Sequence, residues 1–183
     1  MERKILKPRQ ILVPGEYELG NESILNIYFR ICNRGYSEDL PPVIVAHNSL
    51  GNRGENFLTV SDNNRIRIGA YQDQVQRYID NGTEYFLLDG NHRTVACALT
   101  HQPISVLELA TDDDLEEIKR MVKTGELFDW KHESNSLREL VEEFEYSCER
   151  SLDQMMTVEE RVKQLISNRD VPRYMRERYE QCR

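Results

Sequence analysis

The chain has 183 residues, of which 39% are hydrophobic and 31% are charged, and its formal net charge is −8. This length and composition predict one globular domain, with or without an appendage, and no apolar run is long enough to span a membrane. The first residues lack the apolar region of a signal peptide, so we expect a cytoplasmic protein. The pattern of its cysteines predicts free, mostly buried thiols.

The negative charge is concentrated in the middle of the chain. Residues 108–149 contain fourteen acidic and five basic side chains, and the remainder is nearly neutral. A surface that binds DNA needs clustered lysine and arginine, which makes DNA a less favoured partner. We interpret the acidic residues as the solvated faces of helices.

The first elements are a strand and a helix. Residues 5–14 predict a strand that is interrupted at Lys7-Pro8. A helix is predicted over 24–33, with Asn21 or Ser23 as its N-cap.

The next stretch predicts further strands. The continuous apolar run 40–46 is typical of a strand that is buried on both faces. Two short strands are expected at 57–60 and 65–68, joined by a turn, and a helix at 70–80. The short strands would form either a lid over a site or an additional edge hairpin.

A strand, a turn and a helix follow in close succession. Residues 85–88 are apolar and strand-like, Asp89-Gly90 is a turn signal, and 94–99 predict a short buried helix. The first N–H groups of a helix have no partner within the helix, and its dipole is positive there. This turn is therefore a candidate anion site.

The side chains around this turn favour phosphate as the anion. Arg93 can donate two parallel hydrogen bonds to a phosphate, and His92 would lie beside it at the mouth of the site. Asp89 could hold a metal ion with its water shell or accept a proton.

The rest of the chain predicts one more strand and then helices. The strand covers 103–109, and the helices cover 113–124, 137–151, 158–168 and 172–181. Capping boxes begin the second and third of these helices. Because the last three are amphipathic, they either pack on the domain or form a homodimer with a second copy.

The run Asp89-Gly90-Asn91-His92-Arg93, followed by a helix of small residues, resembles the signature of the ParB/sulfiredoxin superfamily. It is closest to the free-serine kinase branch, in which the turn reads Asp-Gly-His-His-Arg. The resemblance implies an α/β fold with a small mixed sheet over residues 1–110, an insertion at 47–84, and a helical C-terminal extension at 111–183.

This resemblance implies a phosphotransferase that uses ATP or ADP, with CTP as a further candidate, together with Mg²⁺. The nucleotide-binding residues would be Lys7, Arg9, Gly90, Asn91, His92, Arg93 and Thr94. The catalytic residues would be Asp89, which also binds the metal, His92, and a carboxylate from the N-terminal loop, for which Glu16, Glu18 and Glu22 are candidates. Lys131 and His132 would anchor a small anionic substrate such as free serine.

Two other functions stay open at this point. One is a partition-type nucleotide switch or a nuclease that acts at DNA, and the other is a protein-binding module without catalysis. Sulfiredoxin activity is disfavoured, because Asn91 occupies the position at which that chemistry needs a cysteine.

Overall fold

The computed structural model describes residues 1–14, 19–50, 62–127, 130, 132–150 and 155–181. Its strands are β1 (Glu2–Leu6), β2 (Ile11–Val13), β3 (Val43–His47), β4 (Tyr85–Asp89), β5 (Ile104–Leu109) and β6 (Met156–Thr157). Its α-helices are α1 (Glu22–Asn33), α2 (Asp62–Asp80), α3 (Asn91–Leu99), α4 (Asp112–Lys123), α5 (Leu137–Arg150), α6 (Val158–Ser167) and α7 (Arg173–Gln181). Short 3₁₀ helices are η1 (Pro8–Gln10), η2 (Ser37–Asp39) and η3 (Asn48–Leu50).

The strands form one mixed sheet in the order β1-β5-β3-β4-β2-β6. The pairs β3–β5 and β2–β4 are parallel, whereas β1–β5, β3–β4 and β2–β6 are antiparallel. This arrangement confirms the predicted α/β class with a mixed sheet. Strand β4, which leads into the candidate anion site, lies inside the sheet with β3 on one side and β2 on the other.

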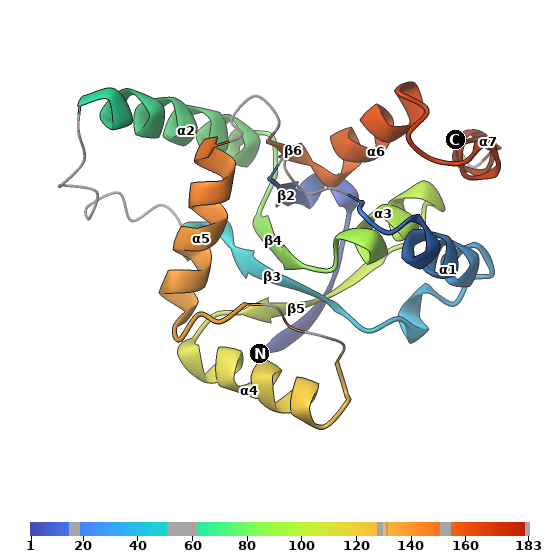
Figure 1. Ribbon diagram of the computed structural model, residues 1–183, viewed down its shortest axis with the longest axis horizontal. Coiled ribbons are helices and arrows are strands. Elements are labelled where there is room, and N and C mark those ends of the chain that lie inside the picture. Colours follow the sequence, from blue (N-terminus) through green and yellow to red (C-terminus); the bar gives the residue numbers. More distant parts are fainter. Residues whose placement is uncertain (15–18, 51–61, 128–129, 131, 151–154, 182–183) are drawn as a thin grey trace.

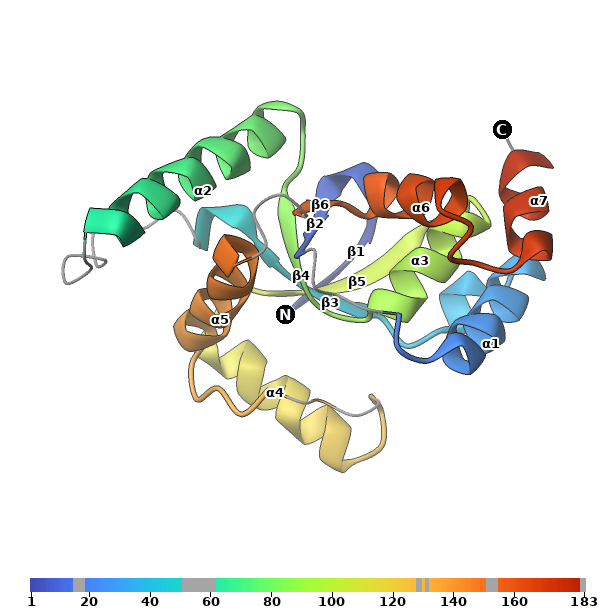
Figure 2. The same ribbon diagram turned by 45° about the horizontal axis from the view of Figure 1, so that its top comes forward.

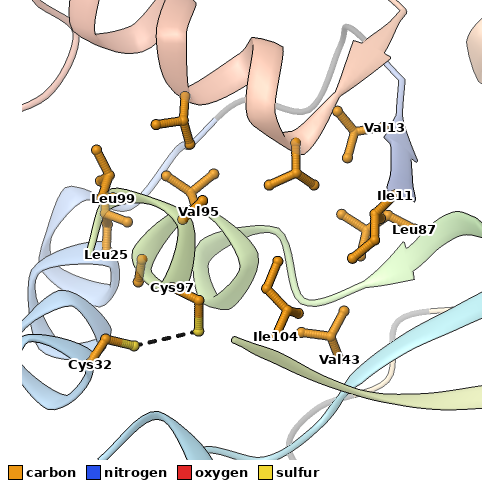
Figure 3. Packing of buried hydrophobic residues seen from close by; sticks show 14 of the residues in the cluster. Ile11, Val13, Leu25, Cys32, Val43, Leu87, Val95, Cys97, Leu99 and Ile104 are labelled. Atoms are coloured by element: carbon orange, nitrogen blue, oxygen red, sulfur yellow. Dashed lines mark hydrogen bonds between the residues drawn. The ribbon is translucent and has the colours of Figure 1, made fainter. Parts of the chain in front are cut away.

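Helices cover both faces of the sheet. Figures 1 and 2 show α1, α3, α6 and α7 gathered on one side and α2, α4 and α5 on the other. Along β4, Tyr85 and Leu87 belong to the first core, and Phe86 and Leu88 belong to the second. Figure 3 shows part of the first core, in which α3 packs between α1 and the sheet. Burial on both faces explains why the strand is continuously apolar.

The N-terminal predictions are confirmed with added detail. The expected break at Lys7-Pro8 is the helix η1, which separates β1 from β2 because the fixed φ of proline suits the start of a helical turn. The N-cap of α1 is Asn21, whose Oδ1 accepts a hydrogen bond of 3.2 Å from the backbone N–H of Ile24.

The predicted strand at 65–68 is wrong, because these residues lie within the helix α2 (Asp62–Asp80). Four alternating residues fit a strand, but the same residues also extend the helical pattern that follows them. Tyr71 and Val75, four residues apart, are buried in the second core and hold the helix on the sheet. The predicted strand at 57–60 lies outside the described residues.

The segment after residue 110 shares both cores with the first part of the chain. Strand β6 pairs with β2, α6 and α7 contribute to the first core, and α4 and α5 contribute to the second. Among the described residues, no helix combines the length and the apolar character needed to cross a membrane.

Candidate functional site

The site is built around Gly90, which joins β4 to α3. Its φ of +105° lies in the left-handed region, and the N–H of Thr94 donates to its carbonyl oxygen at 2.9 Å to begin the helix. A Cβ atom here would lie 3.0 Å from Cγ2 of Val43 and 3.1 Å from Nη2 of Arg93. Glycine is therefore required both for the backbone conformation and for the close approach of the arginine.

Arg93 is buried beneath this turn. Its Nη1 donates to the carbonyl oxygens of Pro41 (2.9 Å) and Pro42 (2.6 Å), and its Nη2 donates to Oδ2 of Asp89 at 2.6 Å. The guanidinium thus ties the end of β4 to the residues that precede β3. The prediction placed this group at the mouth of the site, and that placement is wrong, because two proline carbonyls and a carboxylate engage both terminal nitrogens inside the protein. Its contact with a phosphate stays a prediction.

The predicted nucleotide-binding residues differ in their accessibility. Gly90, Asn91, Arg93 and Thr94 are buried, whereas Asp89 and His92 are partly exposed. The side chain of Asp89 keeps 38% of its surface, although its Oδ2 is held by Arg93. A ligand at this turn would therefore meet Asp89 and His92 first.

His132 reaches the same place from the segment between α4 and α5. Its Nε2 lies 3.1 Å from the carbonyl oxygen of Leu88, the residue before Asp89. Its Nδ1 lies 3.3 Å from Oε2 of Glu143 on α5, and Oε1 of Glu143 accepts a hydrogen bond of 2.9 Å from Ser134. Both partners of the ring are oxygen acceptors, to which a protonated ring nitrogen can donate.

Glu143 and Ser134 are the residues that sequence reasoning missed. Glu143 belongs to the acidic segment that was interpreted as a solvated helix face, and no spacing in the sequence connects it to His132. The contact of Glu143 with His132 depends on the packing of α5 against β4, where Phe86 and Phe144 stack with ring centroids 4.7 Å apart. The structure thus brings together a strand end, a helix start and an imidazole–carboxylate pair.

Lys7 and Arg9 are not brought to this turn. Lys7, the residue before η1, and Arg9 on η1 are both exposed, and the carbonyl oxygen of Arg9 accepts a hydrogen bond of 3.1 Å from Oγ1 of Thr83. The helix η1 therefore lies beside the beginning of β4, whereas the candidate site follows its end. At about 3.3 Å per residue, the six residues from Thr83 to Asp89 separate the two positions by about 20 Å.

Three other predicted residues cannot be placed. Glu16, Glu18 and Lys131 lie outside the described residues. Glu22 is exposed in the first turn of α1.

The described residues do not provide a dedicated metal site. Nowhere in this part of the chain do three or more histidine, cysteine, aspartate or glutamate side chains gather as metal ligands. Asp89 is the predicted ligand, and one of its oxygens already binds Arg93.

Comparison with known proteins adds no relative, since no family model, curated protein or solved structure matches the chain.

Proposed function

We propose that this protein binds a nucleotide through its phosphates at the turn between β4 and α3 and transfers a phosphoryl group from ATP or ADP to a small hydroxyl acceptor such as free serine. The observation that carries the proposal is the position of His132, whose Nε2 lies 3.1 Å from the carbonyl of Leu88 and hence beside Asp89. The imidazole of His132, the Asp89 carboxylate and the N-terminus of α3 then all lie at the end of β4. The signature at 89–93, which resembles that of the free-serine kinases, supports the same function.

Each group has a role in this scheme. The positive end of α3 attracts the phosphates, and His92 can donate a hydrogen bond to them. His132 holds the end of β4 through its contacts with Leu88 and Glu143. Asp89 accepts the proton of the attacking hydroxyl through Oδ1, because Oδ2 is engaged by Arg93. Arg93 is a positioning residue that fixes the carboxylate at the end of the strand.

Mg²⁺ has a limited place in this proposal. It commonly binds proteins through one or two carboxylates and reaches the site on the substrate phosphates. Asp89 is the one side chain that we assign to it, through a water of the ion's shell, because Oδ1 serves as the base and Oδ2 is engaged by Arg93.

The charge of the molecule favours a small acceptor over DNA. The helices α4 and α5, which flank His132, lie in the strongly acidic part of the sequence. Such a surface repels a polyanion, whereas one nucleotide can be held locally at the turn. A nucleotide switch acting at DNA, with CTP as its ligand, is the alternative that the experiment must separate. The cytoplasmic location stays a prediction.

The test is phosphorus NMR of the purified protein with Mg²⁺ and ATP, ADP or CTP, each with and without free serine and a mixed pool of amino acids. We expect a new phosphomonoester signal only when an acceptor is present. Its rate should fall at least about 100-fold in Asp89→Asn, which keeps the size of the side chain and removes the base.

Two controls distinguish a loss of catalysis at the site from a loss of folding. Arg9→Ala should leave turnover unchanged, and circular dichroism should show that Asp89→Asn is folded. Release of inorganic phosphate without a phosphomonoester would contradict the kinase proposal and favour a nucleotide switch. Nucleotide signals that neither shift nor react would show that the turn has only a structural role, and the proposal would be wrong.

A further inference from the structure

Two cysteines meet in the first core, and neither is among the residues assigned to the proposed phosphate site. Cys32 lies near the end of α1 and Cys97 in the second turn of α3. Their Sγ atoms are 3.5 Å apart, and their side chains point toward each other between the two helices (Figure 3). Both residues are almost fully buried, with exposed fractions of 0% and 4%.

We propose that Cys32 and Cys97 form a reversible oxidative modification site, at which hydrogen peroxide converts the two thiols into a disulfide that links α1 to α3. A disulfide bond is about 2.05 Å long, so the two sulfur atoms have to approach by about 1.5 Å. Closing this distance requires rotation about the two Cα–Cβ bonds, with any remainder supplied by a shift of α3 against α1.

The contact between the sulfurs gives them unequal roles. The hydrogen bond from Cys97 lowers the pKa of the Cys32 thiol, and a second hydrogen bond from Thr100 acts in the same direction. The same contact raises the pKa of Cys97, and burial raises it further. Cys32 is therefore the first to ionise and acts as the nucleophile.

The reaction proceeds in two balanced steps. The Cys32 thiolate attacks one oxygen of hydrogen peroxide, the O–O bond breaks, and the released hydroxide takes up a proton, which leaves a sulfenic acid and water. The sulfur of Cys97 then attacks the Cys32 sulfur, the S–O bond breaks, and the departing hydroxide takes the proton of Cys97 as a second water. In sum, the two thiols lose two protons and two electrons, and the peroxide is reduced to two molecules of water.

Cys148 provides an internal control. It is equally buried, on α5, but in the second core, which contains no other cysteine among the described residues. Burial raises the pKa of its thiol, and the nearby carboxylate of Glu145 adds to this effect. We therefore expect Cys148 to stay reduced under conditions that oxidise the pair.

The experiment uses the full chain with Cys182→Ser, which leaves three cysteines. The protein is treated with hydrogen peroxide, unfolded in the presence of N-ethylmaleimide, and analysed by mass spectrometry. We expect one alkylated cysteine and an intact mass about 2 Da below that calculated for the reduced chain with one adduct. The tryptic peptides 31–34 and 94–119 should be linked to each other. Dithiothreitol should restore three alkylated cysteines. Because the bond closes a loop of about 65 residues, the Tm should rise on the order of 10 °C on oxidation.

Several outcomes would overturn the inference. Three alkylated cysteines after peroxide, a link that involves Cys148, a dimer on a non-reducing gel, or Cys32 oxidised beyond the sulfenic acid without a link would each show that the pair is not a modification site. The peptide map of the Cys182→Ser protein gives this answer without any substitution at Cys32 or Cys97. The result does not depend on nucleotide binding, so it stands or falls separately from the proposed function.

Discussion

Replacing Glu145 by glutamine should stabilise the protein at high pH. Glu145 lies on α5 with an exposed fraction of 9%, and its Oε1 receives a hydrogen bond of 3.4 Å from the hydroxyl of Tyr71 on α2. Burial raises the pKa of this carboxyl from 4.5 to about 7, against the opposing effect of Tyr71. The folded protein therefore binds a proton at this site more tightly than the unfolded chain does.

The sign and the size of the effect follow from this difference. Since the pKa is raised in the folded state, stability falls as the pH rises from about 4.5 to 7, and the full cost of burying the charge is present above pH 7. The cost is about 3 kcal/mol at pH 8 and below about 1 kcal/mol at pH 5. Glutamine resembles the protonated carboxyl in size and can accept the same hydrogen bond, so Glu145→Gln removes most of this cost.

The assay is urea denaturation of the wild type and the variant at pH 5 and pH 8, with thermal melting as a second measurement. The Tm at pH 8 should rise by about 6–12 °C, and the gain at pH 5 should be much smaller. The control is Glu159→Gln on α6, which breaks a surface ion pair with Lys163 and should change stability by less than about 1 kcal/mol. An equal gain at both pH values, or a loss at pH 8, would refute the reasoning.

Four further changes test the candidate site and its frame. Gly90→Ala should lower the free energy of unfolding by about 2–3 kcal/mol in urea denaturation, because a Cβ atom meets Arg93 and φ is positive. Arg93→Lys should lower the free energy of unfolding by about 3 kcal/mol in the same assay, since one ammonium group cannot donate to two proline carbonyls and Asp89. A loss below about 1 kcal/mol would contradict the role of these buried hydrogen bonds. Arg9→Ala should leave nucleotide affinity in a calorimetric titration unchanged, and a tenfold loss would bring η1 into the site. Asn21→Ala should cost about 1 kcal/mol through the lost cap of α1, measured by thermal melting.

Local signals predicted the elements of this protein well. The capping box Thr157–Glu160 begins α6 where expected, and Thr111 caps α4 with Asp114 as its partner. Such signals depend on residues three or four apart, which the sequence shows directly. The error at 65–68 arose because a four-residue alternation fits two structures, and the burial of Tyr71 decided between them.

The features of the site that depend on tertiary packing could not be predicted. Arg93 was expected at the mouth of the site. Its burial could not be predicted, because the proline carbonyls that it binds come from a segment about fifty residues earlier in the chain. The contact of His132 with β4 depends on the packing of α5, and Glu143 carries no local mark of this role. The sequence thus predicted the position of the turn, whereas the exposure of its side chains depends on tertiary contacts.

The strand order has a consequence for how the chain reaches its native state. Strand β2, at residues 11–13, lies between β4 and β6, so it is flanked by residues 85–86 and 156–157. A chain emerging from the ribosome cannot complete this sheet until residue 157 has been synthesised. Contacts between such distant segments slow folding. The edge of β2 stays unpaired during that interval, which makes the nascent chain a candidate for chaperone binding until β6 arrives.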